Sequence, residues 1–354
     1  MFANKKSLPY ILGITLLAAI AGFSAFSENA TSGTKKTSKI NGLNFVAPPN
    51  PISKEQMSSI QLSNGNWVGI VPYGYSRGNS PNVWYDTPRQ WWGERSEGTI
   101  KTIAYAKSMG LKIMLKPHVW VLGQGWAGDY QLATDEEWQQ WEKDYEKYIL
   151  AFAHIADSMD VEMFCIGTEY RKAVVARPDF WRQLIKKTRD VYDGKVTYAA
   201  NWDNYQNVQF WDLLDYIGID AYFPLSDTKT PNVATLAQGW NKDFQDIDTF
   251  RQQWQKPVIF TEYGYQSIDY NTEGHWKLSQ DTLSVNLEAQ ANAYEALYRT
   301  FWPQSWFHGG FLWKWHANHS HYGGPSCKRF TPQNKPALDV VKKWYADESI
   351  FIHH

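Results

Sequence analysis

Two glutamates, Glu169 and Glu262, could act together in one catalytic site. Residues 163–168 and 257–261 are runs of β-forming, largely apolar side chains, typical of strands that are buried on both faces. Each glutamate follows such a run and lies between a threonine and a tyrosine. An ionised carboxylate is costly in that position unless the strand opens onto solvent or a polar site. One such glutamate would most simply cap a loop, but the repeated pattern favours one site with two carboxylates.

Two facing carboxyl groups are suited to the hydrolysis of glycosidic bonds. One must be protonated, so that it can give a proton to the leaving oxygen, and the other must be ionised to attack the anomeric carbon. When the groups are about 5–5.5 Å apart, the reaction proceeds through a covalent glycosyl-enzyme with retention of configuration. Their mutual repulsion helps to raise the pKa of the acid.

The elements that would position both glutamates alternate regularly along the chain. Strands are expected at residues 40–47, 67–73, 112–117, 163–168, 195–200, 216–222, 257–261 and 307–313. Helices are expected at residues 54–62, 99–109, 135–157, 180–191, 210–214, 244–254, 283–300 and 336–345. This alternation predicts the α/β class and a single-domain (β/α)8 TIM barrel. Glu169 and Glu262 would end the fourth and seventh strands, on opposite sides of the face that carries the chemistry in such barrels.

Composition excludes several other classes of function. The formal net charge is −1, with no basic patch to bind nucleic acid. No glycine-rich phosphate loop opens a helix, which disfavours a dinucleotide-binding protein. Aromatic residues make up 16% of the chain, and many lie in polar segments with glycine, where flat rings would suit stacking on sugars. Cys165 and Cys327 are expected to be free thiols, since two cysteines make no disulfide framework.

The first residues resemble a secretory signal peptide. Lys5 and Lys6 precede an apolar run that ends in a small-x-small pattern near residue 27. We therefore expect a signal peptide at 1–27, a linker at 28–38 and a catalytic domain at 39–354, in a secreted or periplasmic monomer. An uncleaved membrane anchor is the alternative for the first segment.

Several motifs resemble those of glycoside hydrolase family 113. They are Ile166-Gly167-Thr168-Glu169, Thr197-Tyr198-Ala199-Ala200-Asn201-Trp202, the segments 215–224 and 260–265, Gly310-Phe311-Leu312-Trp313-Lys314-Trp315, and Asn334-Lys335-Pro336-Ala337. The resemblance implies hydrolysis of β-1,4-mannan with retention, with Glu169 as the acid/base and Glu262 as the nucleophile. Many members of the wider clan place an asparagine before the acid/base to bind the sugar 2-hydroxyl, but this chain has Thr168.

Further residues are candidates for substrate binding. Asn201 could replace the missing 2-hydroxyl contact, or it could simply cap a loop. By the same resemblance, Tyr222 would donate a hydrogen bond to the nucleophile, with interior packing as its simpler role. The remaining candidates are a wall at Trp202, a floor for the bound sugar at Trp313 or Trp315, and hydroxyl donors at Lys116 and His118.

A metal-dependent reaction is the rival chemistry. His316, His319 and His321 lie close together after the eighth strand, but metal hydrolases on barrels draw ligands from several strand ends. We therefore expect no cofactor or metal. The resemblance to glycoside hydrolase family 113 implies a retaining endo-β-1,4-mannanase. The alternatives are an exo-mannosidase or β-glucanase of the same clan, and a carbohydrate-binding barrel without activity.

Overall fold

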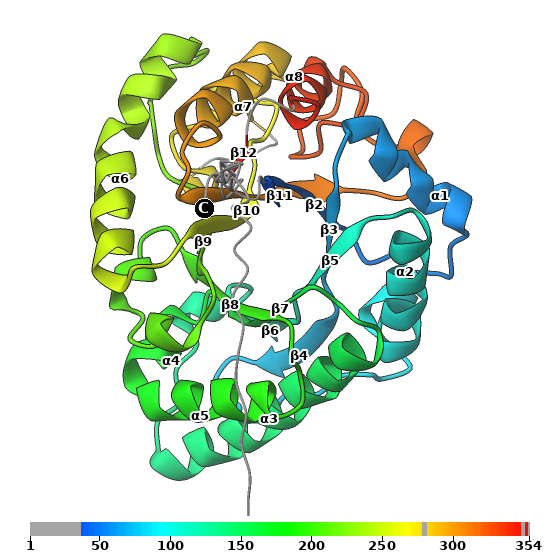
Figure 1. Cartoon of the computed structure of the whole chain (residues 1–354), viewed down its shortest axis with the longest axis vertical. Coiled ribbons are helices and arrows are strands. Elements are labelled where there is room, and N and C mark those ends of the chain that lie inside the picture. The colour runs from blue at the N-terminus through cyan, green and yellow to red at the C-terminus, as the bar shows by residue number, and fades with distance from the viewer. Residues whose placement is uncertain (1–36, 278–281, 348–350, 353–354) are drawn as a thin grey trace, which may run out of the picture. The chain divides into compact units, whose positions relative to one another are not determined.

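Eight parallel strands form a closed barrel, which confirms the predicted fold. The computed structural model describes residues 37–277, 282–347 and 351–352. Around the barrel the strands follow the order β10, β11, β2, β3, β5, β7, β8, β9 (Figure 1). Their bounds are Ile40–Phe45 for β2, Trp67–Ile70 for β3, Lys112–Leu115 for β5, Met163–Thr168 for β7, Lys195–Asn201 for β8, Ile217–Asp220 for β9, Val258–Tyr263 for β10 and Phe307–Trp315 for β11. Each of the eight predicted strands overlaps one of these.

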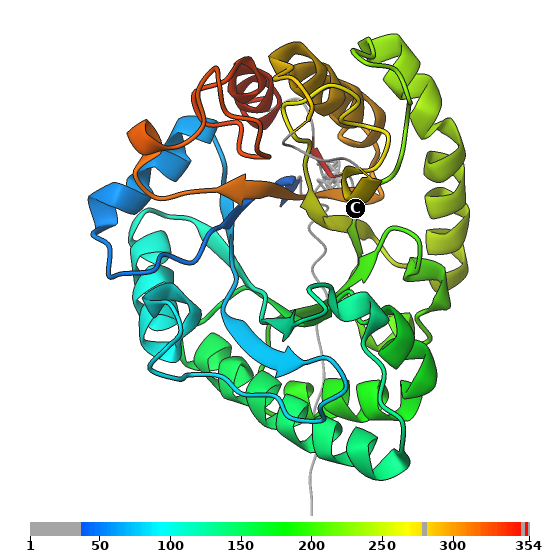
Figure 2. The same cartoon turned by 180° about the vertical axis from the view of Figure 1, so that it is seen from behind.

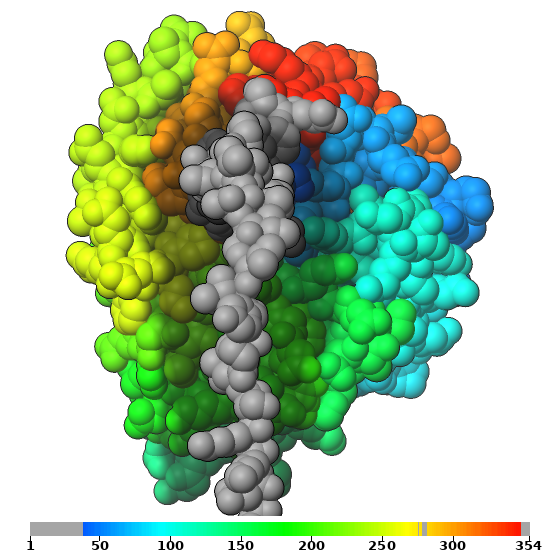
Figure 3. Space-filling view, viewed as in Figure 1, coloured from blue at the N-terminus to red at the C-terminus, as the bar shows by residue number. Residues whose placement is uncertain are grey.

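Helices surround the barrel in chain order, as the views from both sides show (Figures 1 and 2). They are α1 Lys54–Ser58, α2 Ser96–Ser108, α3 Asp135–Ser158, α4 Arg171–Ala176, α5 Pro178–Arg189, α6 Val233–Trp254, α7 Leu287–Phe301 and α8 Pro336–Tyr345. In the space-filling view, α2 and α6 lie on opposite flanks of the molecule (Figure 3).

Helix α4 was not predicted, the helix predicted at 54–62 is α-helical only as far as Ser58, and two further helix predictions differ more strongly from the structure. The segment predicted as a helix at 210–214 is only a short 3-10 turn, Trp211–Leu213, so β8 has no α-helix before β9. Helix α6 begins at Val233, well before the predicted residue 244, because the side chain of Asn232 accepts a hydrogen bond from the backbone N–H of Thr235 and caps the helix.

Two small sheets accompany the barrel and were not predicted. Strand β4 (Tyr73–Arg77) continues the chain beyond β3, and strand β6 (His118–Leu122) continues it beyond β5. These two pair in parallel, in register from Tyr73 with His118 to Arg77 with Leu122. The other sheet joins β1 (Thr37–Ser38) to β12 (Phe351–Ile352) in antiparallel fashion.

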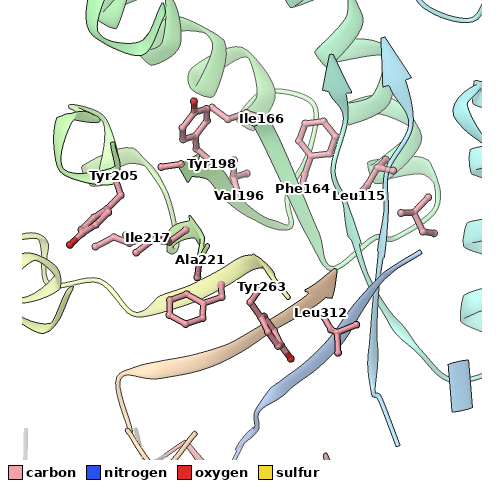
Figure 4. Close-up of a cluster of buried hydrophobic side chains, with 14 of the residues drawn as sticks. Leu115, Phe164, Ile166, Val196, Tyr198, Tyr205, Ile217, Ala221, Tyr263 and Leu312 are labelled. Atoms are coloured by element: carbon pink, nitrogen blue, oxygen red, sulfur yellow. The ribbon is translucent and has the colours of Figure 1, made fainter. Parts of the chain in front are cut away.

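Side chains on the barrel strands divide between two cores. Inside the barrel, Met114, Met163, Cys165, Ile259 and Phe311 form a small apolar cluster. Their neighbours along the strands join a larger cluster between barrel and helices, part of which is shown in Figure 4 with Leu115, Phe164, Ile166, Val196 and Leu312 labelled. This alternation follows from the two-residue period of a strand.

The structure tests few of the expectations about the chain ends. The expected signal peptide at 1–27, and the linker as far as residue 36, lie outside the described residues. Within the described part, no helix combines the length and apolar character needed to cross a bilayer. Cys165 and Cys327 are both free, as expected.

Candidate active site

Glu262 faces the mouth of the barrel because β10 is irregular just before it. Phe260 pairs with Ile219, and Glu262 pairs with the next residue, Asp220, so Thr261 is extra in this ladder. Phe260 packs outward in the larger core, and strict alternation would have turned Glu262 outward as well. A bulge of this kind re-aims the side chain that follows it. The irregularity therefore brings the carboxylate to the inner side.

Glu169 follows a second irregular stretch, at the end of β7. Cys165 pairs with Thr197, whereas Thr168 pairs with Ala199, so β7 has one residue more than β8 in this interval. The backbone of Glu169 is left-handed, with φ of 54°, and its N–H donates to the Ala199 carbonyl at 2.8 Å. A left-handed glutamate is uncommon, and such strain tends to occur where function requires a side chain to be aimed.

Both oxygens of Glu262 have hydrogen-bond donors. The ammonium of Lys116 lies 2.5 Å from Oε1, and the hydroxyl of Tyr222 donates to Oε2 at 2.7 Å. Tyr222 thus makes the contact with Glu262 that the resemblance implied. Lys116 has no exposed surface, so its ammonium is committed to this ion pair rather than offered to a sugar hydroxyl.

Asp220 completes a buried charged group with Lys116 and Glu262. Its Oδ1 lies 3.5 Å from the Lys116 ammonium and accepts a hydrogen bond from the Thr261 hydroxyl at 2.7 Å. Burial and the charge of Glu262 raise the pKa of Asp220 to about 7, although Lys116 opposes the shift. Burial disfavours the charged form of Lys116, but the two carboxylates outweigh it and raise its pKa. The group therefore holds two acidic side chains around one cation.

Glu169 has a different environment, which favours its protonated form. Burial and then the charges of Asp220 and Glu262 raise its pKa well above the usual value, and a hydrogen bond from Trp126 partly opposes this. That bond runs from the indole N–H to Oε2 at 2.7 Å. The guanidinium of Arg171 lies 4.8 Å from the Trp126 ring centre and so holds the indole from the other side.

Trp126 is a site residue that sequence reasoning did not assign. The segment Gly125-Trp126-Ala127-Gly128 stood out only as an aromatic residue among glycines. Arg171, which steadies it, is itself held by ion pairs to Asp129 at 2.7 Å and Asp203 at 3.2 Å. In the sequence, the closest indication of this network was Arg171, which follows the candidate acid Glu169 by two residues.

The other candidates on the strand-five side lie near this network. Asn201 is buried, and its amide donates to Asp203 at 2.8 Å, so one end of its side chain belongs to the loop. Trp202 is half-buried and stacks on Trp276, with ring centres 5.3 Å apart and planes 16° apart. Thr168 is only 1% exposed, which leaves it no access to a sugar.

The two tryptophans of β11, Trp313 and Trp315, lie in different environments. Trp313 lies at the mouth of the barrel and lines a cavity there. Trp315 is fully buried, and its indole N–H donates to the Ser59 hydroxyl at 3.1 Å, so it cannot form the floor of a sugar site. The reason is a register irregularity between Trp313 and Trp315 in the pairing with β2, which breaks the parity that the sequence suggested.

The histidines have environments suited to packing. His118 stacks on Tyr73 with ring centres 5.2 Å apart, and burial together with the charge of Lys116 lowers its pKa to about 4. His316 stacks on Tyr322 at 4.1 Å, and burial lowers its pKa to about 4 as well. Among the described residues, no three histidine, cysteine or acidic side chains are grouped so as to hold a metal ion.

The two carboxyl groups are in unequal environments. The raised pKa of Glu169 favours its protonated form, whereas Glu262 is fixed in an ion pair with Lys116. Glu169 directly follows β7 and Glu262 lies near the end of β10, three strands further around the barrel, and the charge of Glu262 reaches Glu169. Such an unequal pair can divide the roles of acid and nucleophile between two residues of the same type.

Comparisons with known proteins agree with this arrangement. The model of Glycoside Hydrolase Family 113 matches residues 49–335. A structure of a β-mannanase of that family from Alicyclobacillus acidocaldarius, in complex with ManMIm, has 26% sequence identity and a TM-score of 0.75, over 88% of this chain and 98% of that one. Two further β-1,4-mannanase structures of the family also have 26% identity, with TM-scores of 0.75 and 0.76, over 88% of this chain and 100% of theirs. A search of curated protein sequences found no significant match.

Proposed function

The chain belongs to glycoside hydrolase family 113, and on that basis we propose that it is a secreted β-mannanase that cleaves β-1,4-mannosidic bonds with retention. The family membership and the β-mannanase neighbours support a glycoside hydrolase. The observation that carries the mechanism is the inequality of the two carboxyl groups, with Glu169 buried beside negative charges and Glu262 fixed by Lys116 and Tyr222.

In the first step, Glu262 attacks the anomeric carbon while Glu169 gives its proton to the leaving oxygen. Burial and the neighbouring negative charges raise the pKa of Glu169, which favours the protonated form that the acid needs. Tyr222 and Lys116 hold the attacking carboxylate by one oxygen each, which restricts its rotation. The products are a free leaving sugar and a covalent glycosyl-enzyme.

In the second step, Glu169 acts as a base. It has lost its proton and now accepts one from the attacking water, which displaces Glu262 and restores both side chains to their starting state. The hydrogen bond from Trp126 stabilises the charged form of Glu169 that exists between the two steps. The released sugar has the β configuration of the substrate.

Azide distinguishes the two roles. In Glu169→Ala, an activated aryl β-mannoside still forms the glycosyl-enzyme, and azide then replaces the water that lacks a base, which gives a β-mannosyl azide. In Glu262→Ala, azide enters the vacated space and attacks from the opposite face, which gives the α-azide. An α-azide from Glu169→Ala would reverse the assignment, and full activity in either variant would exclude the two-carboxylate mechanism.

Substrate preference and export need separate tests. Rates on mannan, cellulose and xylan should rank mannan first, and faster cleavage of either other polymer would replace the proposed substrate. Product analysis on manno-oligosaccharides separates endo from exo action. N-terminal sequencing of exported protein should begin near Glu28, and a mature protein that retains Lys5 and Lys6 would contradict cleavage.

A further inference from the structure

The segment 327–330, which lies between β11 and α8, is held by buried hydrogen-bond donors. Each of its four backbone carbonyls accepts a hydrogen bond, although the segment forms neither a helix nor a strand. The donors are Ser267 from the loop after β10, Gln290 from α7, and Lys335, the residue before α8. All three have little or no exposed surface. An irregular segment whose carbonyls are all engaged in this way is fixed in position.

Ser267 and Lys335 hold three of the four carbonyls together. The backbone N–H of Ser267 donates to the Lys328 carbonyl at 3.2 Å, and its hydroxyl donates to the Cys327 carbonyl at 2.5 Å. The same hydroxyl accepts a hydrogen bond from the Lys335 ammonium at 2.8 Å. That ammonium also donates directly to the Arg329 carbonyl at 2.6 Å. Lys335 therefore orients Ser267 and fixes the segment by a bond of its own.

Lys335 is a charged side chain in a place where an apolar one would cost less to bury. It is 5% exposed, and within the described ranges its partners are neutral oxygens and the Cys327 thiol rather than a carboxylate. Burial accordingly lowers its pKa to about 8. A methionine would fill similar space without the desolvation of a charge. What the ammonium adds is a set of donors for the segment 327–330.

The segment ends at Phe330, which packs against the tyrosine that holds the nucleophile. The rings of Phe330 and Tyr222 meet edge to face, with centres 6.1 Å apart and planes at 69°. Tyr222 in turn donates to Glu262 Oε2 at 2.7 Å. The amide of Gln290 donates to the Phe330 carbonyl at 2.9 Å and to the Tyr265 carbonyl at 2.8 Å, so the backbone of Phe330 is tied to the loop after β10. A ring held in this way limits the movement of the Tyr222 hydroxyl away from the carboxylate.

We propose that Lys335 is a positioning residue for the nucleophile. It fixes the segment 327–330, so that Phe330 keeps the Tyr222 hydroxyl on the carboxylate. The proposal rests on the proposed function, in which Glu262 is the attacking group. It gives Lys335 no contact with the substrate and no part in proton transfer. Loss of the ammonium should therefore slow the attack by Glu262 and leave the binding of the sugar nearly unchanged.

Trapping of the glycosyl-enzyme separates attack from binding. The sugar of a 2-deoxy-2-fluoro-β-mannosyl fluoride is transferred to Glu262 and leaves slowly, so mass spectrometry follows the transfer. In Lys335→Met, the first-order trapping rate at saturation should fall about fivefold, below the roughly tenfold loss expected when the whole hydrogen bond to a charged group is removed. The half-saturating concentration should stay within about twofold. Lys39→Met is the matched control, because Lys39 is also buried and donates to the backbone carbonyls of Gln304 and Phe307, and it should leave both values unchanged.

A double-mutant cycle with Tyr222→Phe shows whether the effect passes through Tyr222. That variant has no hydroxyl to donate to Glu262, so adding Lys335→Met to it should lower the trapping rate by less than about twofold. Losses that multiply in the double variant would overturn the proposal, because they would show that Lys335 acts by another route. A folded Lys335→Met with the trapping rate of the wild type would overturn it too, as would a change confined to the half-saturating concentration.

Phe330→Leu provides a second variant if Lys335→Met does not fold. Phe330 is half-buried, and leucine keeps part of its apolar volume while the edge-to-face contact with Tyr222 is lost. The saturating rate should fall again, and this fall should also disappear in the Tyr222→Phe background. A trapping rate equal to that of the wild type would contradict the route from Phe330 to the nucleophile.

Failure of the proposed function gives a different result in the wild-type protein. Labelling of Glu262 by the β-glucosyl reagent and not by the β-mannosyl one would contradict the mannanase proposal, and the same cycle with the β-glucosyl reagent would then test Lys335 by itself. Absence of labelling at Glu262 with both reagents would overturn both proposals.

Discussion

Replacing Lys116 by methionine should disable Glu262 without changing the shape of the site. Methionine retains most of the apolar stem of lysine but has no charge. The lost ammonium lies 2.5 Å from Glu262 and 3.5 Å from Asp220, and neither Lys116 nor Asp220 has exposed surface. With an effective dielectric constant of about 20, these separations correspond to gross attractions of roughly 7 and roughly 5 kcal/mol.

The expected loss is smaller than those gross attractions, since solvation and proton uptake compensate in part. Removing one partner of a buried ion pair typically costs about 3–5 kcal/mol. Two carboxylates without their shared cation will take up a proton at a higher pH than before. Because the nucleophile must be ionised, the acid-side limb of the pH–rate profile should move to higher pH. At the wild-type optimum we expect kcat/KM to fall by about 10²–10³-fold, as when a charge-stabilising group is removed from an active site.

The assay should isolate the attack step. A 2-deoxy-2-fluoro-β-mannosyl fluoride reacts with the nucleophile but releases slowly, and its fluoride leaving group needs no proton from Glu169. The trapping rate, followed by mass spectrometry across pH, therefore reports Glu262 alone. Lys39→Met is the matched control. Lys39 is also a buried lysine, 2% exposed, but it donates to the Gln304 carbonyl at 2.6 Å rather than to a carboxylate. A folded Lys116→Met with the trapping rate and pH profile of the wild type would refute the role given to Lys116.

Other substitutions should act in defined directions. Trp126→Phe removes the donor that lowers the pKa of Glu169, so the alkaline limb of kcat/KM should move to higher pH. Asp220→Asn removes a negative charge that raises that same pKa, so the limb should move to lower pH; an equal shift in one direction for both would contradict the assignment. Tyr345→Phe removes hydrogen bonds to the Gly42 carbonyl at 2.8 Å and the Tyr263 hydroxyl at 2.6 Å, and should lower the free energy of unfolding by about 1–2 kcal/mol in denaturant titrations without changing kcat.

The barrel could be predicted because its signals are local. Most barrel strands are short, largely apolar runs, and most helices carry a regular apolar stripe, so the alternation of strands and helices was enough to predict the architecture. The secondary-structure predictions failed where an element depends on residues distant in sequence or where its sequence lacks a regular pattern. The segment 210–214 looked helical, yet only Trp211–Leu213 forms a turn. Strand β4 has the polar sequence Tyr-Gly-Tyr-Ser-Arg, which shows no apolar alternation.

The sequence indicated which carboxylates lie at the mouth of the barrel, but it did not indicate the contacts that support them. Both glutamates could be selected as candidates because each follows an apolar run, but no period-two pattern could indicate the bulges that aim them inward. The same limitation explains Trp315. Strict alternation along β11 predicted that it would face the mouth as Trp313 does, but a register irregularity lies between them and Trp315 is buried. Lys116 was interpreted as a hydroxyl donor because the local sequence could not show its ion pairs. Its partners, Asp220 and Glu262, are more than a hundred residues away in the chain.

The sheet of β4 and β6 forms a wall beyond the barrel strands that hold the two carboxylates. The strands that deliver Glu169 and Glu262 end at the rim, whereas the chain beyond β3 and β5 continues upward as its own hydrogen-bonded ladder and presents Tyr73, Tyr75 and Trp120. Because β4 and β6 form a two-stranded sheet of their own, side chains on this wall can vary with little change to the strands that hold the carboxylates. Directed evolution of a changed substrate preference would therefore begin at residues 73–77 and 118–122, away from the strands that hold Glu169 and Glu262.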